Sequence, residues 1–300
     1  METQLAAVAA PTPTQDDPTI WRVDDALWAE LQPLLVVDKP RKKPGRKRND
    51  DRPILDGLIW LSRTSAQWAA WPRAEFGARS TAHDRLQEWV EYGCLARAWA
   101  HLLALYDDEI GLHWEWQAAD GCIVKAPLGK KGDRGEVEAT GANPTDRAKC
   151  GSKRHLLTEG RGIPLATVLS GANRTDMKKL ADLLDAIVVA LPPEVIEGER
   201  HLCLDLGYAY DDCREEAAAR GYTVHLPPPR NAPRPVPAPG DPARHPARRW
   251  VVEVTHSWFN RFRRLLVRWE KKAANYLGFV QLAACLIIYR KLRHARAPFG

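Results

Sequence analysis

The sequence predicts an α/β protein in which a small all-α region precedes a domain built on a mixed sheet. Over the first 110 residues, apolar side chains recur at helical spacing, three or four positions apart. From residue 114 onwards, short apolar runs bounded by glycine and polar residues replace that pattern, as expected for strands. We therefore predict a helical domain over 21–110 and a sheet-containing domain over 111–292. Residues 1–20 are rich in Ala, Pro and Thr and are expected to be disordered.

The helical region begins with a segment that Asp24 can cap and that extends to Leu35. Pro33 inside this segment predicts a kink or an early end, because proline removes a backbone donor. Three further helices are expected: one after a cap at Asn49 or Asp50, one from near Ser80, and one over about 95–106.

The densest positive charge of the chain lies between the first two of these helices, at 39–48. Two prolines and a glycine exclude a regular helix there, so an extended basic arm is expected. An arm of this kind beside short helices is typical of a small DNA-binding module, with a helix-turn-helix variant as one candidate. A solvated linker or a general polyanion binder is the alternative. The candidate phosphate contacts are Lys39, Arg41, Lys42, Lys43, Arg46, Lys47 and Arg48.

Composition narrows the class of protein. The net charge of +6 favours a polyanionic partner. None of the six cysteines forms a C-x-x-C pair, which argues against a zinc ribbon or a thioredoxin-like site. The first twenty residues lack a basic segment of the signal-peptide kind, and the longest apolar stretch, 277–289, is too short to cross a bilayer. A reduced, soluble, cytoplasmic protein with no membrane association is expected.

The sequence pattern of the second domain predicts alternating strands and helices. A strand over 114–125 contains Asp120, and a buried strand over 201–205 ends in Asp205. The remaining expected elements are a hairpin over 154–158 and 163–169, a helix from Thr175 or Asp176 to Val189, a helix over 211–219, a strand over 222–226, an irregular Pro-rich insert over 227–246, and closing helices over 249–268 and 272–291.

Asp120 and Asp205 are the candidate chemical groups of this domain. A carboxylate in or after an apolar strand is costly to bury unless it is paired or binds a metal ion. Although 85 positions apart, the two can meet at one sheet edge, where carboxylate oxygens select Mg²⁺ or Mn²⁺. Taken as single residues, a hydrogen-bonded structural Asp120 and a capping or turn role for Asp205 remain open.

Glu253 is the candidate third carboxylate. It lies in the first turn of an amphipathic helix, four positions after Arg249. The same position would also let it balance the helix dipole without any catalytic role. The rest of this predicted helix has a basic face formed by Arg261, Arg263, Arg264, Arg268, Lys271 and Lys272.

Several motifs together resemble the DDE transposases of bacterial insertion sequences, and among them the IS-four/IS-five superfamily. The resemblance covers residues 21–291. In the front half it is carried by Ala26-Leu-Trp-Ala-Glu-Leu, Pro44-Gly-Arg, Ile54-Leu-Asp-Gly-Leu-Ile-Trp60, Gln67-Trp68 and Phe76-Gly77. In the second half it is carried by Ala119-Asp-Gly-Cys-Ile-Val-Lys125, Lys153-Arg-His-Leu-Leu157, Leu204-Asp-Leu-Gly-Tyr208, Arg249-Trp-Val-Val-Glu253 and Trp258-Phe-Asn-Arg-Phe-Arg-Arg264.

The resemblance implies a ribonuclease-H-like catalytic domain that cleaves and transfers DNA strands with Mg²⁺ or Mn²⁺. It implies that Asp120, Asp205 and Glu253 are both the catalytic residues and the metal ligands. Arg249 would contact a DNA phosphate or orient Glu253, and Arg261, Arg263 and Arg264 would supply further DNA contacts. The implied partner is double-stranded DNA, as terminal inverted repeats and target DNA, bound by a homodimer in the bacterial cytoplasm at the nucleoid.

Two positions depart from the family pattern. Val254 stands where relatives often have arginine, and Asn260 stands where the wider signature has lysine. Two other functions therefore stay open beside the transposase: a decayed or regulatory DNA-binding protein, and a nuclease of the same fold. Metal dependence separates the first of these from a transposase, and joining of a 3′ end separates the second.

Overall fold

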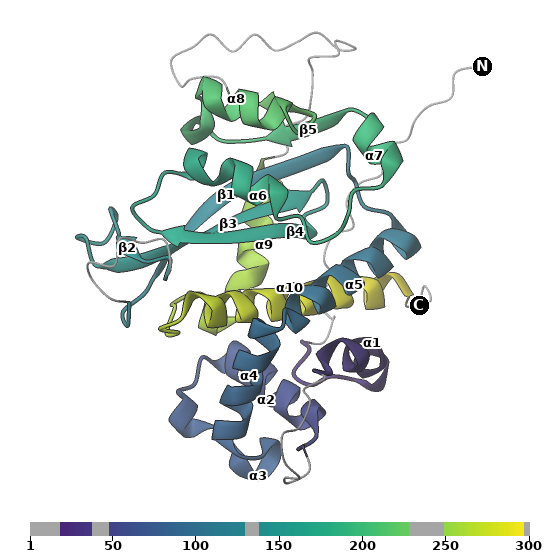
Figure 1. Ribbon diagram of the computed structural model, residues 1–300, viewed down its shortest axis with the longest axis vertical. Coiled ribbons are helices and arrows are strands. Elements are labelled where there is room, and N and C mark those ends of the chain that lie inside the picture. The colour runs from purple at the N-terminus through teal and green to yellow at the C-terminus, as the bar shows by residue number, and fades with distance from the viewer. Residues whose placement is uncertain (1–18, 38–47, 130–137, 228–248, 297–300) are drawn as a thin grey trace.

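The computed structural model describes residues 19–37, 48–129, 138–227 and 249–296. A mixed sheet occupies one end of the molecule and short helices occupy the other (Figure 1). Between them lie two long helices side by side, α5 (Cys94–Ile110) and α10 (Ala273–Arg296), which form the most extensive helix–helix contact among the described elements. The mixed α/β class predicted from the sequence is confirmed.

The helical part forms where capping residues begin apolar segments. Asp24 accepts a hydrogen bond from the Leu27 amide, and Asp50 accepts one from the Arg52 amide, so both expected caps are present. Pro33 lies inside the first helix, which ends two residues later at Leu35. The elements are α1 (Asp25–Leu35), α2 (Asp51–Thr64), η1 (Trp68–Ala70), α3 (Arg73–Phe76), α4 (Arg79–Glu91) and α5.

The sheet has the spatial order β4-β3-β1-β5-β6, with the two-residue β2 at the start of β3. Strands β1, β3 and β4 are antiparallel neighbours, whereas β5 is parallel to β1 and β6 is parallel to β5. Three antiparallel strands followed by two parallel ones is the ribonuclease-H-like arrangement that the resemblance to DDE transposases implies. The strands are β1 (Trp116–Lys125), β2 (Gly141–Ala142), β3 (Cys150–Glu159), β4 (Pro164–Gly171), β5 (Arg200–Cys203) and β6 (Tyr222–His225).

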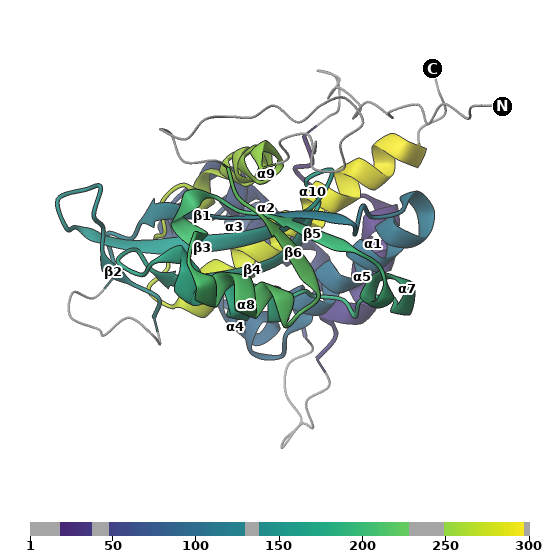
Figure 2. The same ribbon diagram turned by 90° about the horizontal axis from the view of Figure 1, so that it is seen from above.

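Helices cover both faces of the sheet. Figure 2 shows α9 (Trp250–Asn260) on one face and α8 (Asp211–Ala218) on the other. Helix α9 packs on β1 and β3. The other elements of this part are η2 (Asp176–Lys179), α6 (Leu180–Asp185), α7 (Pro193–Glu197), η3 (Leu206–Tyr208) and η4 (Arg263–Leu265).

Three helix boundaries differ from the sequence prediction. The expected helix over 175–189 is a 3-10 turn followed by a short helix that ends at Asp185. Helix α9 ends at Asn260 rather than near 268. Helix α10 is longer than expected, and its length and composition would be enough to cross a membrane, but 72% of its most apolar part is buried inside the protein. Packing against α5, α4 and β4 therefore accounts for its apolar character.

The early end of α9 corrects the prediction of a continuous basic face. The Arg264 side chain is only 3% exposed, and its Nε donates to Oε1 of Glu270 at 2.7 Å. Arg268 is fully buried and donates to Ser152 Oγ at 2.7 Å. The prediction that Arg264 contacts DNA is wrong, because its guanidinium faces the interior and is neutralised there.

Breaking the Arg264–Glu270 pair should destabilise the fold strongly. Replacing Glu270 with Gln leaves a buried guanidinium without its counter-charge, and such changes cost about 3–5 kcal/mol. The free energy of unfolding, measured by urea denaturation, should fall by that amount. The exposed neighbour Arg263 is the matched control, and Arg263→Gln should change it by less than about 0.5 kcal/mol. Equal small effects in both variants would show that the pair does not hold this segment.

Candidate active site

Asp120 and Asp205 come together through the register of two parallel strands. In β1 and β5, Ala118 is paired with Cys203. Asp120 lies two residues beyond Ala118, and Asp205 lies two residues beyond Cys203, so the two aspartates are level at neighbouring positions of the sheet. Both side chains are half-buried. Strand pairing thus sets these two positions beside each other, and the role of either residue stays a prediction.

The electrostatic setting of Asp120 is unfavourable to its ionised form. Burial raises the pKa of Asp120 to about 6, and the charges of Asp205 and Asp176 act in the same direction. The Gly121 amide, which donates to Asp120 Oδ1 at 2.8 Å, and the guanidinium of Arg249 act in the opposite direction. Several carboxylates therefore share a region in which a bound cation would offset their repulsion.

Asp205 also shapes the backbone that follows β5. Its Oδ1 accepts a hydrogen bond from the Gly207 amide at 2.8 Å, and the residue caps the 3-10 turn η3. The capping role left open by the sequence is therefore present. Asp205 Oδ1 orients the turn through this hydrogen bond. Asp205 Oδ2 takes no part in it.

Glu253 forms an ion pair with Arg249 at the start of α9. It is exposed in the first turn of α9, and its Oε1 is 2.8 Å from Nη2 of Arg249. Within the residues that the structure describes, no three His, Cys, Asp or Glu side chains are close enough together to hold a metal ion. The structure thus assembles two of the three predicted carboxylates and places the third in a surface ion pair.

A fourth carboxylate, Asp176, lies beside β1 and β3. Its Oδ2 is 3.1 Å from Lys153 Nζ, and its Oδ1 is 3.2 Å from His155 Nδ1. These two partners lower the pKa of Asp176 despite its burial. The absence of a side chain at Gly121 makes room for this carboxylate, since a Cβ there would overlap Asp176. His155 is a buried, partnered core histidine, as expected from its apolar neighbours.

Tyr208 adds an unpaired hydroxyl to the same region. The residue is 1% exposed, and its hydroxyl has no hydrogen-bond partner among the described residues. Burial, together with the charges of Asp176, Asp120 and Asp205, raises the Tyr208 pKa far above its usual range. The phenol is therefore a neutral donor available to a group that enters between the aspartates.

Asp176 and Tyr208 were not predicted from the sequence to be functional. Tyr208 stands in the motif Leu204-Asp-Leu-Gly-Tyr208, and both partners of Asp176 stand in Lys153-Arg-His-Leu-Leu157. A signal was present, because a lysine on a buried strand needs a counter-charge. The position of Asp176 in the sequence indicated only the start of a helix.

Apart from buried Arg264, the predicted DNA-contact residues fall into three groups. Arg261 and Arg263 are exposed just after α9, and Arg249 is half-exposed beside Glu253. Arg48 is already paired with Asp51 and Glu88. The other arm residues, Lys39, Arg41, Lys42, Lys43, Arg46 and Lys47, lie outside the described residues.

Comparison with protein families agrees with this geometry. A family model described as "Transposase DDE domain" matches residues 117–288, a span that contains Asp120, Asp205 and Glu253. The chain belongs to the DDE transposase family. A second model, described as "Putative transposase of IS4/5 family", matches residues 23–99 in the helical part of this transposase.

Two curated relatives come from Burkholderia cepacia. A protein described as a putative transposase for insertion sequence element IS402 is 39% identical over 158 residues, 52% of this chain and 71% of the relative. An uncharacterized 16.2 kDa protein of the same element is 33% identical over 35% of this chain and 73% of its own length. A solved pre-cleavage Mos1 transpososome has a TM-score of 0.28 at 16% identity, over 88% of this chain and 84% of the other. That likeness is too weak to carry an argument.

The family depends on divalent metal ions, and the residues of this transposase fit such an ion in part. Asp120 and Asp205 supply hard oxygen donors, and their mutual repulsion would be relieved by a cation. Glu253 fits only if its carboxylate leaves Arg249, because it is now engaged in that ion pair and forms no cluster of candidate ligands among the described residues. The assignment of all three as ligands remains a prediction.

The raised pKa of Asp120 makes a testable contribution to stability. Its pKa in the folded protein, about 6, lies above the ordinary value of 3.8, so the ionised carboxylate costs stability as pH rises from about 4 through 6. Asp120→Asn should therefore stabilise the metal-free protein at pH 7.5, by up to about 3 kcal/mol, but hardly at pH 4. Urea denaturation in EDTA measures the free energy of unfolding at both pH values, and exposed Asp212→Asn is the control. An effect of Asp120→Asn that is equal at the two pH values would contradict a raised pKa of Asp120 in the folded protein.

Proposed function

We propose that this chain is an insertion-sequence transposase that cuts DNA strands at the ends of its element and joins the freed 3′ ends to target DNA. The observation that carries the proposal is the level placement of Asp120 and Asp205 on β1 and after β5, inside the span matched by the transposase DDE domain. Cleavage and joining are both displacements at a phosphodiester, so one site serves both.

Each residue of the site has a proposed task. Asp120 and Asp205 hold the metal ion, Mg²⁺ or Mn²⁺, with Asp205 kept in orientation by the Gly207 amide. When bound there, the ion supplies Lewis-acid stabilisation of the charge that develops on the phosphate. Glu253 completes the donor set once it is released from Arg249. Arg249, thereby freed, contacts the DNA phosphate that approaches the sheet edge.

The proposed partner is double-stranded DNA, in the form of terminal inverted repeats and target DNA. Arg249 lies at the start of α9, and exposed Arg261 and Arg263 lie just after its end. The arm at 39–48 adds further positive charge to the sequence. Pairing two element ends calls for more than one subunit, so we propose a homodimer on DNA. A cytoplasmic location at the nucleoid follows from this substrate.

We propose the same two functional domains that were predicted from the sequence. Residues 21–110 would bind DNA and residues 111–292 would carry the chemistry. Helix α10 packs against α5 of the first part and β4 of the second. The two parts therefore share one layer of apolar contacts.

A DNA-binding protein without catalysis is the second candidate. The observation in its favour is the Arg249–Glu253 ion pair, which leaves the described residues without a three-carboxylate set. Val254 and Asn260 on α9 are uncharged and only half-exposed, so they do not replace the basic residues usual at those positions. This candidate would bind DNA with or without Mg²⁺ and would never cut it.

Replacing Asp205 should separate these two functions. In Mg²⁺ or Mn²⁺, the wild-type chain should cut labelled DNA that carries the element's inverted repeats and join the ends to target DNA. Asp205→Ala should lower the cleavage rate at least about a thousandfold, on the scale of removing a main electrostatic group. Its DNA binding, measured without metal, should stay within about twofold of wild type, because the proposed metal ligands do not contact DNA in the absence of the ion. Exposed Asp211→Ala on α8 is the matched control and should keep full activity.

Binding by the wild-type chain without cutting in either metal ion would favour the non-catalytic candidate. Cutting without joining would favour a nuclease. Full cleavage by Asp205→Ala would overturn the assignment of this site.

A further inference from the structure

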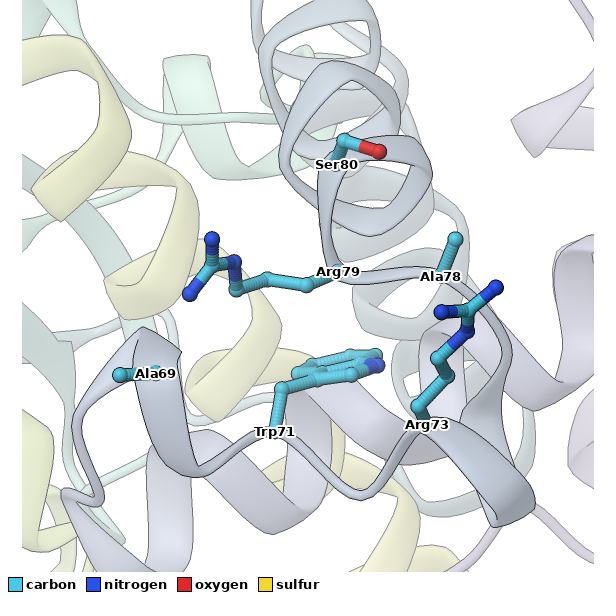
Figure 3. A pocket seen from close by; sticks show the side chains of 6 residues that line it. All are labelled: Ala69, Trp71, Arg73, Ala78, Arg79 and Ser80. Carbon is cyan, nitrogen blue, oxygen red and sulfur yellow. The ribbon is translucent and has the colours of Figure 1, made fainter.

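An open cleft lies in the helical part, among η1, α3 and the start of α4, at the end of the molecule opposite α8 (Figure 1). It is not part of the sheet-edge site. The residues that line it are Ala69, Trp71, Arg73, Ala78, Arg79 and Ser80. Figure 3 shows the indole of Trp71 between the side chains of Arg73 and Arg79.

The floor of the cleft is fixed by tight aromatic packing. Trp71 is 6% exposed and its indole N–H donates to the Gly77 carbonyl at 3.1 Å. Its ring crosses α2 at Gly57, where a Cβ would overlap the indole, and it meets the Phe76 ring edge-on at 5.6 Å between ring centroids. The backbone that carries the two arginines is therefore held in place before any ligand arrives.

The two arginines are exposed and uncompensated. Neither Arg73 nor Arg79 has a carboxylate partner among the described residues. Neighbouring arginines of the same part do have partners, since Arg22 pairs with Glu75 and Arg85 with Asp51. The nearest acid on α3 is thus already used by Arg22, and the cleft keeps the positive charge of both arginines.

The start of α4 reinforces that charge. Ala78 at the cap position has no capping side chain, and the first turn has no acidic residue. Arg79 places a cation at the positive end of the helix dipole, where an anionic group is normally favoured. An anion in the cleft would offset this unfavourable arrangement, and it would meet both the guanidinium groups and the free amides of the first turn.

We propose that this cleft binds a phosphate of the DNA backbone, with Arg73 and Arg79 as the contacting residues. The inference rests on the proposed function, because it takes DNA as the substrate. It adds a second, rigid contact to the arm at 39–48. Arginine geometry suits phosphate oxygens, and the open cleft admits a backbone that continues past it on both sides. Such a contact sets the position of the duplex and reads no base sequence.

The test is the salt dependence of DNA binding by the full chain in EDTA. Fluorescence anisotropy with a labelled duplex gives the slope of log affinity against log salt concentration, and its magnitude decreases by about 0.9 for each phosphate that the protein no longer neutralises. Arg73→Gln/Arg79→Gln should weaken binding at all sequences and reduce the magnitude of the slope by about 0.9, the loss of one neutralised phosphate. Thermal unfolding should not change, because both side chains are exposed.

The matched control removes two arginines that are paired on the surface. Arg214 pairs with Asp211 and Arg296 pairs with Glu109, so Arg214→Gln/Arg296→Gln lowers the net charge equally. It should leave the slope within about 0.3 of wild type, because neither arginine is expected to contact a phosphate. The single variant Arg79→Glu should weaken binding more than Arg79→Gln, since it repels the phosphate.

An unchanged slope in Arg73→Gln/Arg79→Gln, with DNA still bound, would overturn the inference and leave the proposed function intact. An equal decrease in the control would also overturn it, because net charge alone would then explain the effect. A wild-type chain that does not bind DNA would instead overturn the proposed function.

Discussion

The parallel pairing of β1 with β5 is the constraint on which the site depends. It joins two segments 85 positions apart and sets Asp120 and Asp205 level with each other. Side chains alternate between the faces of a strand, so a register slip of one residue in β5 would turn that strand's side chains to the other face. The apolar residues of both strands, including fully buried Ala119 and Leu202, resist that slip because it would expose them.

Placing Asp120 beside Asp205 and Asp176 creates a local excess of negative charge, which is only partly compensated by neighbouring cations. Asp176 forms an ion pair with Lys153 and lies within 3.2 Å of His155, and Glu253 pairs with Arg249. No such ion pair relieves Asp120 within the described part of the chain, and its raised pKa reflects the cost. The exposed Arg249–Glu253 pair contributes little stability in water, so it can open when a stronger ligand for either side chain arrives.

Local sequence patterns were sufficient for most elements near the site. Strands β1, β3, β4, β5 and β6 follow apolar runs, and the caps Asp24 and Asp50 are visible as single residues. Long-range partners were not visible. The segment after Asn260 has the pattern of a basic helix, yet Arg264 pairs with Glu270 and Arg268 with Ser152 in the interior. Periodicity cannot report such burial, because a basic stripe looks the same whether it faces water or a buried carboxylate.

The most direct measurement of the cation site is Mn²⁺ binding without DNA, followed by the decrease of the free-ion electron paramagnetic resonance signal during titration with the full chain. We predict saturable binding by the wild-type chain, abolition of that binding in Asp120→Asn/Asp205→Asn, and unchanged binding in the exposed control Asp211→Asn/Asp212→Asn. Equal Mn²⁺ binding by all three proteins would show that β1 and β5 do not build a cation site.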